Sequence, residues 1–287
     1  MIVRPNRLSF NTVINSWATS YLPESALRSE ALLLRMIKYY KSDTYATVSP
    51  DVVTFSSVLN ALAKSEAVQF KAKKCSSILK AMLDLYEVDG NNDTRPNVIC
   101  YNTVLNAAAF SARGSEAERR QALSVAVETF NQMKQSKYVA PDAVSYGHML
   151  KACANLVPPG EQRNAIASKI FAACCEEGLV GGMCLDEIRR CVPPPVFLHL
   201  LAGCGYDEPL RRSRKPYSVS LQELPRQWTR LVAKTDMAQR QRSTFEKPKN
   251  RSRKKEQALH RDHSDKSPHV IPRPGLLVEY GASGRDL

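Results

Sequence analysis

Four stretches of the chain place an aliphatic residue three positions before a small, mostly polar residue. The aliphatic residues are Leu8, Val53, Ile99 and Val144. The small residues are Asn11, Ser56, Asn102 and Gly147. At the outward-facing start of a helix, such an aliphatic side chain could hold a base by its face while the polar neighbour hydrogen-bonds its edge. The pattern therefore indicates a surface that reads unpaired bases.

The elements that would position these residues recur with a fixed period. Each stretch opens with proline followed by Asn or Asp, and the prolines Pro5, Pro50, Pro96 and Pro141 are 45, 46 and 45 residues apart. Proline disfavours helix in the residue before it, and Asn or Asp can cap the helix that follows. Apolar residues then recur at helical spacing, and a second amphipathic stretch completes each unit. The second stretches are residues 26–40, 70–86, 117–133 and 165–175.

A repeated helix pair predicts an all-α solenoid, because one pair cannot bury its apolar face without a stacked neighbour. We expect helices to begin within a few residues of Asp51, Asn97 and Asp142. Aromatic and valine residues at helical spacing are expected to form the core. They are Phe10, Phe55, Tyr101, Tyr146, Val13, Val58 and Val104.

The recurring pattern resembles that of pentatricopeptide repeat proteins: Pro-Asp/Asn, two residues, Ser/Thr/Cys, Phe/Tyr, Asn/Ser, Thr/Ser, then Val/Ile-Leu. The resemblance covers roughly residues 4–177. It implies a right-handed superhelix of helix pairs that binds single-stranded RNA in a mitochondrion or plastid. The period departs from the family length of about 35 residues, so the extra residues are expected to lengthen helices or loops. Candidate insertions are residues 42–49, 88–95 and 158–162.

The resemblance also implies which residues read bases. In the family, the residue three positions after the aliphatic works with the Asp or Asn that ends the same repeat. The resulting pairs are Asn11 with Asp51, Ser56 with Asn97, and Asn102 with Asp142. Family pairing implies uracil for Asn with Asp and adenine for Ser with Asn, hence a preference for U-A-U read 5′ to 3′. The residues implied to pack between bases are Leu8, Val53, Ile99 and Val144. Gly147 has no side chain, so the fourth repeat is expected to be unselective.

Residues 178–232 are predicted to form a C-terminal helical cap on the last of four repeats, which occupy residues 1–177. The two helices expected there are residues 183–192 and 196–203. The following Leu224-Pro225-x-x-Trp228 motif resembles the segment that closes the array in algal and diatom-type members with long repeats. Trp228 is interpreted as a docking anchor, with base stacking as the alternative.

Basic residues exceed acidic residues by 13, and most of the excess lies near the C-terminus. Residues 1–210 hold 22 basic and 20 acidic side chains, whereas residues 211–287 hold 19 and 8. The near-neutral repeats would gain little from phosphate attraction, so their binding would depend on base contacts. Residues 233–287 are predicted to be a disordered basic tail, because they contain too few apolar residues for a core. The charge run 247–255 is compatible with a solvated tail, a phosphate-contacting arm or a nuclear import signal.

The eight cysteines form no Cys-x-x-Cys pair, and Cys184, Cys191, His199 and Cys204 fit no common zinc spacing. We therefore expect no metal and no cofactor, and a reducing compartment is favoured. The sequence has no run of about 18 apolar residues, so no membrane span is expected. The first repeat begins at Pro5 and leaves no room for an organellar targeting peptide. The chain is thus expected to be a fragment or to act where it is made.

No catalytic motif is visible, since the sequence lacks Gly-x-x-x-x-Gly-Lys, Gly-x-Ser-x-Gly and His-Glu-x-x-His. Residues 178–287 also lack the carboxylate cluster of a metallonuclease and the His-x-Glu with Cys-x-x-Cys of a deaminase. The protein is predicted not to be an enzyme and to have no small-molecule substrate. The favoured function is sequence-selective binding of single-stranded RNA in organellar RNA processing or stability, alongside other RNA-processing proteins. The alternative is a protein-interaction scaffold, which the near-neutral repeats favour.

Overall fold

The computed structural model describes residues 5–20, 22–42, 48–203 and 219–232. These residues lie in the first of two compact units, residues 1–237, and the second unit, residues 238–287, lies outside the described residues. The described residues form helices and no strand, which confirms the predicted all-α class. The helices are α1 (Arg7–Thr19), α2 (Ser25–Lys41), α3 (Val52–Lys64), α4 (Lys71–Glu87), η1 (Asn92–Thr94, a 3-10 turn), α5 (Val98–Ala109), α6 (Glu116–Gln135), α7 (Ala143–Leu156), α8 (Glu161–Glu177), α9 (Gly182–Cys191), α10 (Pro194–Gly203) and α11 (Arg226–Thr229).

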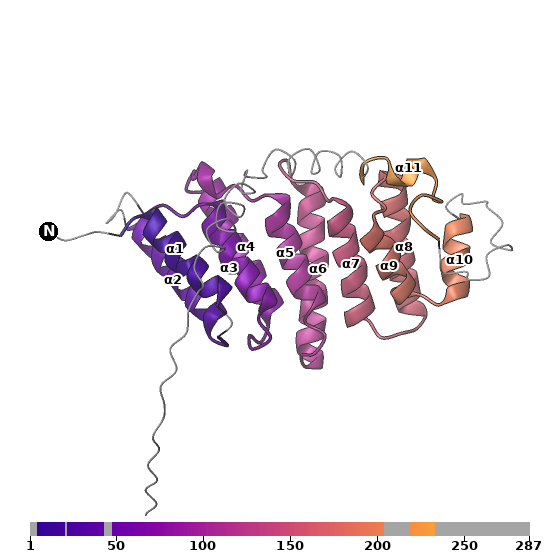
Figure 1. Ribbon diagram of the computed structural model, residues 1–287, viewed down its shortest axis with the longest axis horizontal. Helices are drawn as coiled ribbons and strands as arrows, with labels where there is room; N and C mark the ends of the chain where they lie inside the picture. Colours follow the sequence, from indigo (N-terminus) through magenta and orange to yellow (C-terminus); the bar gives the residue numbers. More distant parts are fainter. Residues whose placement is uncertain (1–4, 21, 43–47, 204–218, 233–287) are drawn as a thin grey trace, which may run out of the picture. The chain divides into compact units, whose positions relative to one another are not determined.

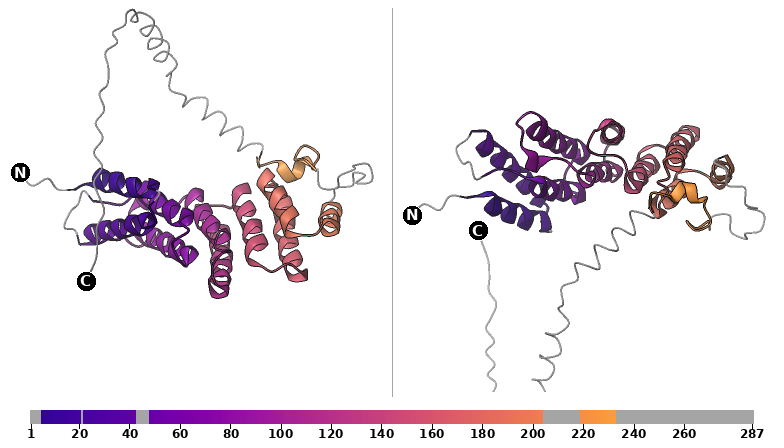
Figure 2. Two further views of the ribbon diagram at one scale, coloured as in Figure 1. Left: turned by 60° about the horizontal axis from the view of Figure 1, so that its bottom comes forward. Right: turned by 90° about the horizontal axis from the view of Figure 1, so that it is seen from above.

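Helices α1 to α8 form four helix pairs that stack in chain order (Figure 1). The first helix of each pair packs against the first helix of the next, so that α1, α3, α5 and α7 form one row. The second helices α2, α4, α6 and α8 pack against their own first helix and against the next one. Figure 2 shows the same order of helices from two further sides. This arrangement is the predicted solenoid of helix pairs, and its right-handedness stays a prediction.

Each first helix begins at an Asn or Asp side chain that caps it. Asn6, Asp51, Asn97 and Asp142 accept a hydrogen bond from the backbone N–H three residues later. These bonds satisfy donors that the first turn of a helix leaves without a partner. In three of the four caps a hydroxyl at the third helical residue bonds back to the cap: Ser9, Thr54 and Ser145. The predicted helix starts are therefore confirmed.

The core lies between the stacked helices. Most of the predicted core residues are buried there, namely Phe10, Phe55, Tyr101, Tyr146, Val58 and Val104. The prediction for Val13 is wrong, because its side chain is 45% exposed. Helices α3 and α5 pack on a preceding helix pair, whereas no described pair precedes α1. An open hollow of about 350 Å³ remains beside α1 and is lined in part by Val13 and Phe10.

The second helices match their predicted stretches except at the start of α8. That helix begins at Glu161, four residues before the predicted start. Residues 161–164 are polar and form a largely exposed first turn of α8. A search for regularly spaced apolar residues therefore does not include them. Residues 158–162 therefore form most of the short link between α7 and α8 and the first residues of α8, and their status as an insertion stays a prediction. Of the other two candidate insertions, residues 88–95 hold η1, and part of the first, residues 43–47, lies outside the described residues.

Beyond the fourth pair, α9 packs against α7 and so continues the row of first helices. Helix α10 begins at Pro194, earlier than predicted, because proline is tolerated in the first turn of a helix. Trp228 in α11 is 2% exposed, and its ring lies edge-on to Phe171 of α8 with the centroids 6.2 Å apart. This burial fits a docking anchor and leaves no open face for base stacking. The division into repeats 1–177 and a cap at 178–232 stays a prediction.

The predicted disordered tail, residues 233–287 with its charge run 247–255, lies outside the described residues. Among the described helices none is long and apolar enough to span a membrane. The seven described cysteines are buried and form no disulfide, and Cys204 lies outside the described residues. Within the described ranges no group of three or more His, Cys, Asp or Glu side chains is placed to hold a metal ion.

Candidate nucleic-acid interface

An exposed aliphatic residue occupies the same position in each of the four first helices. Leu8, Val53, Ile99 and Val144 are the second residues of α1, α3, α5 and α7. Their side chains are 44% to 72% exposed. Because these helices pack one on the next, the four side chains form a row, which we call the aliphatic row. Apolar area left in water at equivalent positions of successive repeats is typical of a surface that contacts a partner.

The first of the predicted reading residues, Asn11, is held by the helix of the next repeat. Its Nδ2 donates to Oδ1 and Oδ2 of Asp51 at 3.3 and 3.4 Å. Its Oδ1 accepts from Oγ1 of Thr54 at 2.6 Å. Asp51 meanwhile caps α3, since its Oδ1 accepts from the backbone N–H of Thr54 at 2.8 Å. The amide of Asn11 is therefore fixed at both of its ends by one first turn.

Asn102 repeats this arrangement two repeats further on. Its Nδ2 donates to Oδ1 of Asp142 at 3.1 Å, and its Oδ1 accepts from Oγ of Ser145 at 2.6 Å. Asp142 caps α7 through the backbone N–H of Ser145 at 2.8 Å. An amide has two N–H donors and two lone pairs on its oxygen, so these contacts leave one donor and one acceptor of each amide unused; Asn11 is half-buried, whereas Asn102 is only 9% exposed. Each amide can therefore offer a donor and an acceptor together.

The second predicted pair, Ser56 with Asn97, is not joined by a hydrogen bond. The hydroxyl of Ser56 donates to the backbone carbonyl of Val52 at 2.7 Å. The side chain of Asn97 accepts from the backbone N–H of Cys100 at 3.1 Å and is otherwise exposed. Ser56 is too short to reach the cap, and its Oγ lies 3.6 Å from Sγ of Cys100. The structure thus brings together two of the three predicted pairs.

Two residues that hold the reading amides were missed from the sequence. Thr54 and Ser145 both occupy the third position of a first helix, and both are fully buried. The recurring pattern includes this Ser/Thr/Cys position. The role of this position could have been inferred from how its residue changes along the chain. It is Thr54 or Ser145 where the preceding repeat carries Asn, and Cys100 where the preceding repeat carries Ser56.

The fourth repeat has neither a reading side chain nor a capping partner. Gly147 is buried against α9, and a Cβ added there would lie 2.7 Å from Cγ and Sδ of Met183. The residue that precedes α9 is Gly181, which makes no side-chain cap. A Cβ on Gly181 would lie 3.3 Å from Cβ of Ala143 in α7. Close packing of α9 on α7 therefore occupies the place where a fourth base would be read.

Charges are sparse on the first helices. The charged side chains of α1, α3, α5 and α7 are Arg7, Lys64 and Lys151. Arg7 is paired, because it lies 2.8 Å from Asp93 and 3.8 Å from Asp51. Beside Gly147, burial and, to a lesser extent, the nearby Lys151 lower the pKa of His148 to about 4, against the opposing effect of Asp142. His148 is therefore neutral at pH 7, and the face is close to uncharged.

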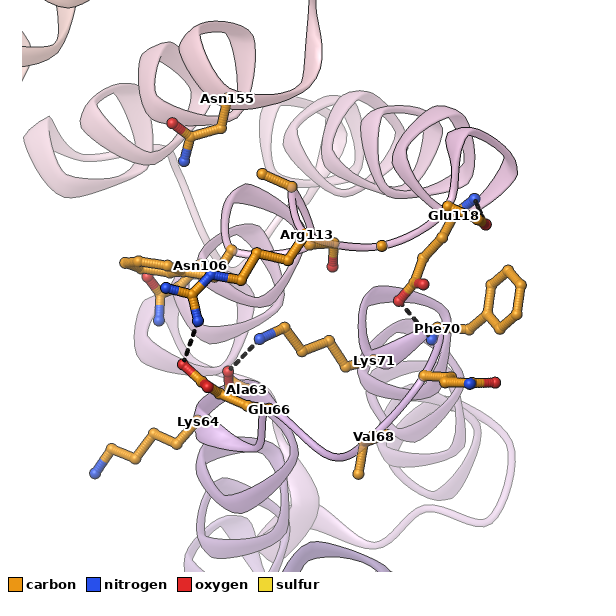
Figure 3. Close-up of a pocket in the computed structure, with 16 residues that line it drawn as sticks. Ala63, Lys64, Glu66, Val68, Phe70, Lys71, Asn106, Arg113, Glu118 and Asn155 are labelled. Atoms are coloured by element: carbon orange, nitrogen blue, oxygen red, sulfur yellow. Dashed lines mark hydrogen bonds and ion pairs between the residues drawn. The ribbon is translucent and has the colours of Figure 1, made fainter. Parts of the chain in front are cut away.

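A hollow of about 890 Å³ lies between the α3–α4 turn and the α5–α6 turn (Figure 3). Arg113 crosses it to Glu66 at 3.1 Å. Phe70 has a left-handed backbone with φ of 50°, and its N–H donates to Glu118 at 2.8 Å. Lys71 donates to backbone carbonyls at the end of α3, and burial lowers the pKa of its amine. Arg113 and Glu118 thus contact the preceding repeat, and Lys71 ties α4 to the end of α3 within its own pair, so the hollow lies at a junction between repeats.

Stacked helix pairs, a row of exposed aliphatic residues and amides held across repeat boundaries define a helical-repeat protein of the α-solenoid class. Residues 86–156, from the end of α4 to the end of α7, match the pentatricopeptide repeat domain. This match confirms the resemblance over that stretch. Proteins with this domain are generally non-catalytic RNA-binding proteins and are commonly organellar. No curated protein and no solved structure matches the chain. The likeness to algal members and to their terminal motif stays a prediction.

Proposed function

We propose that this protein binds single-stranded RNA with sequence selectivity and without catalysis, in organellar RNA processing or stability, in a mitochondrion or plastid. The observation that carries the proposal is the identical fixing of two amides, Asn11 and Asn102, by the first turn of the next repeat. Each lies one helical turn from an aliphatic side chain that has no described cover. A fixed donor and acceptor beside an apolar surface suits the edge and face of one base.

The mechanism rests on preorganisation. An amide that is already immobilised loses little conformational freedom when it binds, so more of the hydrogen-bond energy is retained as affinity. Uracil presents an N–H flanked by carbonyl oxygens, which one amide donor and one amide acceptor can match. Asn11 and Asn102 are thus assigned to uracil. The assignment of Ser56 with Asn97 to adenine rests on the family pairing alone, and together they predict U-A-U.

Fluorescence anisotropy with labelled RNA tests this proposal. The probes are a U-A-U triplet within a run of cytidines and the same strand with C-C-C in its place. We expect tighter binding of U-A-U, by about five-fold for each hydrogen-bonded base, since a hydrogen bond contributes about 1 kcal/mol. The double variant Asn11→Ala with Asn102→Ala should lose discrimination at the first and third bases and keep that at the second. Absence of RNA binding to the wild-type chain at low salt would overturn the proposal.

A second candidate function is a protein-interaction scaffold. It is favoured by the uncharged first helices combined with the aliphatic row. The two functions differ in their dependence on salt, because RNA binding releases counterions and weakens as salt rises. Association with RNA-processing proteins is compatible with either function. Burial of the aliphatic row in a protein complex, with no affinity for RNA, would favour the scaffold.

A further inference from the structure

We propose that three residues, and not two, set the choice of each base. The third member is the residue at the third position of the next first helix, which is Thr54, Cys100 or Ser145. This inference rests on the proposed function, because it assigns a specificity-determining role within the same reading surface.

The contact that carries the inference occurs twice, in independent repeats. Oγ1 of Thr54 and Oγ of Ser145 each lie 2.6 Å from Oδ1 of the Asn of the preceding repeat. These are the shortest contacts that either amide makes, compared with 3.1 to 3.4 Å to the aspartates. Both hydroxyls are fully buried, so water does not replace them. A buried amide oxygen without a donor would cost about 1–3 kcal/mol.

Hydroxyl and carboxylate together leave one orientation of the amide. A carboxylate only accepts hydrogen bonds, so it requires the amide nitrogen on its side. The hydroxyl accepts from the N–H of its own cap residue, at 3.2 Å for Asp51 and 3.1 Å for Asp142, and has a single hydrogen to donate. Two acceptors lie within reach of that hydrogen: Oδ1 of the capping aspartate, at 2.7 Å from Thr54 and 2.9 Å from Ser145, and the amide oxygen, which is nearer at 2.6 Å. The flipped amide would set its oxygen against the carboxylate and is excluded.

The remaining repeat has a different third residue and a different reader. Cys100 occupies the third position of α5, after Ser56 and Asn97. The cap of α5 is the one among the four first helices in which the side chain at the third position does not bond back to the backbone N–H of the cap residue. A thiol is only a weak hydrogen-bond donor, so it would not hold an amide oxygen as Thr54 does. Each unit consists of a reading residue, a cap residue and the residue at the third helical position. Along the chain the three units are Asn-Asp-Thr, Ser-Asn-Cys and Asn-Asp-Ser.

Recoding the second unit separates a two-residue rule from a three-residue rule. One variant carries Ser56→Asn and Asn97→Asp, and the other adds Cys100→Ser. We expect the triple variant to prefer uracil over adenine at the second base about five-fold more strongly than the double variant, which corresponds to one hydrogen bond. Equal preferences of the two variants would overturn the inference.

Substitutions at Thr54 give a second, conservative test. Thr54→Val should lower the preference for uracil at the first base about five-fold and leave the third base unchanged, whereas Thr54→Ser should retain it. Ser9→Ala is the matched control, because Ser9 bonds the cap Asn6 but no described repeat precedes α1 to supply an Asn for it to hold. It should lower thermal stability without changing base choice.

The outcomes distinguish this inference from the proposed function. If the wild-type chain binds no RNA, the proposed function fails and the inference fails with it. If the wild-type chain prefers U-A-U and neither Thr54→Val nor Cys100→Ser in the recoded chain alters base choice, only the three-residue inference is overturned. Circular dichroism of each variant checks that the helices are intact.

Discussion

Asp51 and Asp142 each use one carboxylate for two tasks. The same Oδ1 that caps a helix also accepts from the amide of the preceding repeat. A change at either aspartate would therefore alter both helix stability and the reading surface. A change at the Asn that faces it alters the reading surface while the cap stays in place, so the Asn positions are the cleaner test of function.

Asn102→Ala should weaken binding to U-A-U RNA by about 1 kcal/mol, the usual contribution of a hydrogen bond. The loss should appear only when the third base is uracil, so discrimination at that base falls while the first two bases are read as before. Asn106→Ala, one turn further along α5, is the matched control and should leave base choice unchanged. Anisotropy with the third base varied measures the effect. Uniform weakening across all sequences would contradict base reading at this position.

His148 should make stability depend on pH. Burial lowers its pKa to about 4 in the folded chain, against about 6.5 for an exposed histidine. The unfolded chain therefore binds the proton more readily, and stability should fall as the pH drops from about 6.5 towards 4. His148→Asn should reduce this loss while unfolding like the wild type near pH 7.5. Thermal unfolding between these pH values measures it, and parallel curves for the two proteins would contradict the assignment.

At the scale of elements, the close approach of α9 to α7 is predicted to set where base reading ends. Gly147 and Gly181 sit where the earlier repeats carry a reader and a cap, and both face the neighbouring helix at short range. The glycines let the two helices pack, and Met183 covers the site. The fourth repeat is thus predicted to read no base, because Met183 of α9 covers the position in addition to the missing side chain.

Gly147→Ala should destabilise the chain by about 1 kcal/mol, the lower range for overpacking a core. The added methyl would meet Met183 at 2.7 Å, and a flexible methionine can move partly aside. Adding Met183→Ala should recover part of the loss. The control is Gly203→Ala, where an added methyl meets nothing within 4 Å. Urea unfolding gives the free energy of unfolding of the wild type, Gly147→Ala, the double variant and Gly203→Ala. Equal losses of stability in Gly147→Ala and Gly203→Ala would contradict the packing argument.

The sequence predicts those features that are decided locally. Helix starts could be predicted because Pro-Asp and the hydroxyl at the third helical position act within one turn. The exposure of Val13 could not, because burial at that position depends on a preceding helix pair. The cover over Gly147 comes from Met183, far along the chain, so no local pattern indicates it. Likewise the amide contacts of Thr54 and Ser145 cross a repeat boundary, and they become visible only when the helices are stacked.

At the scale of the whole molecule, affinity and selectivity are predicted to reside in different parts of the chain. The first helices carry few charges, whereas residues 211–287 hold 19 basic and 8 acidic side chains. Phosphate attraction is independent of sequence and sensitive to salt. We therefore expect the repeats to select the base sequence and the basic C-terminal region to supply unselective affinity.

Removal of residues 233–287 should flatten the salt dependence of RNA binding and leave the preference for U-A-U unchanged. The matched control ends after residue 255 and so keeps the charge run 247–255, which holds six Lys and Arg residues. The control should retain most of the wild-type slope of log affinity against log salt. RNA affinity measured at several salt concentrations gives the slope for each protein. Identical slopes for the wild type and the two truncated chains would show that this region does not contact RNA.

The amide of each reading Asn is completed by the helix that follows, and this has a consequence for how such a chain could lengthen or shorten. Consider a gene duplication that copies one helix pair and whose breakpoints lie between pairs. It separates the Asn of that pair from its original Asp and hydroxyl, and it places the Asn next to those of the copied pair. The new junction keeps its reading only when the incoming first turn carries the same two residues. Breakpoints inside the first helices, after the hydroxyl at the third position and before the reading residue at the fifth, preserve every unit. Each Asn is then copied together with the cap and hydroxyl that follow it. The natural module of inheritance is accordingly offset from the structural repeat: it begins inside one first helix and ends inside the next.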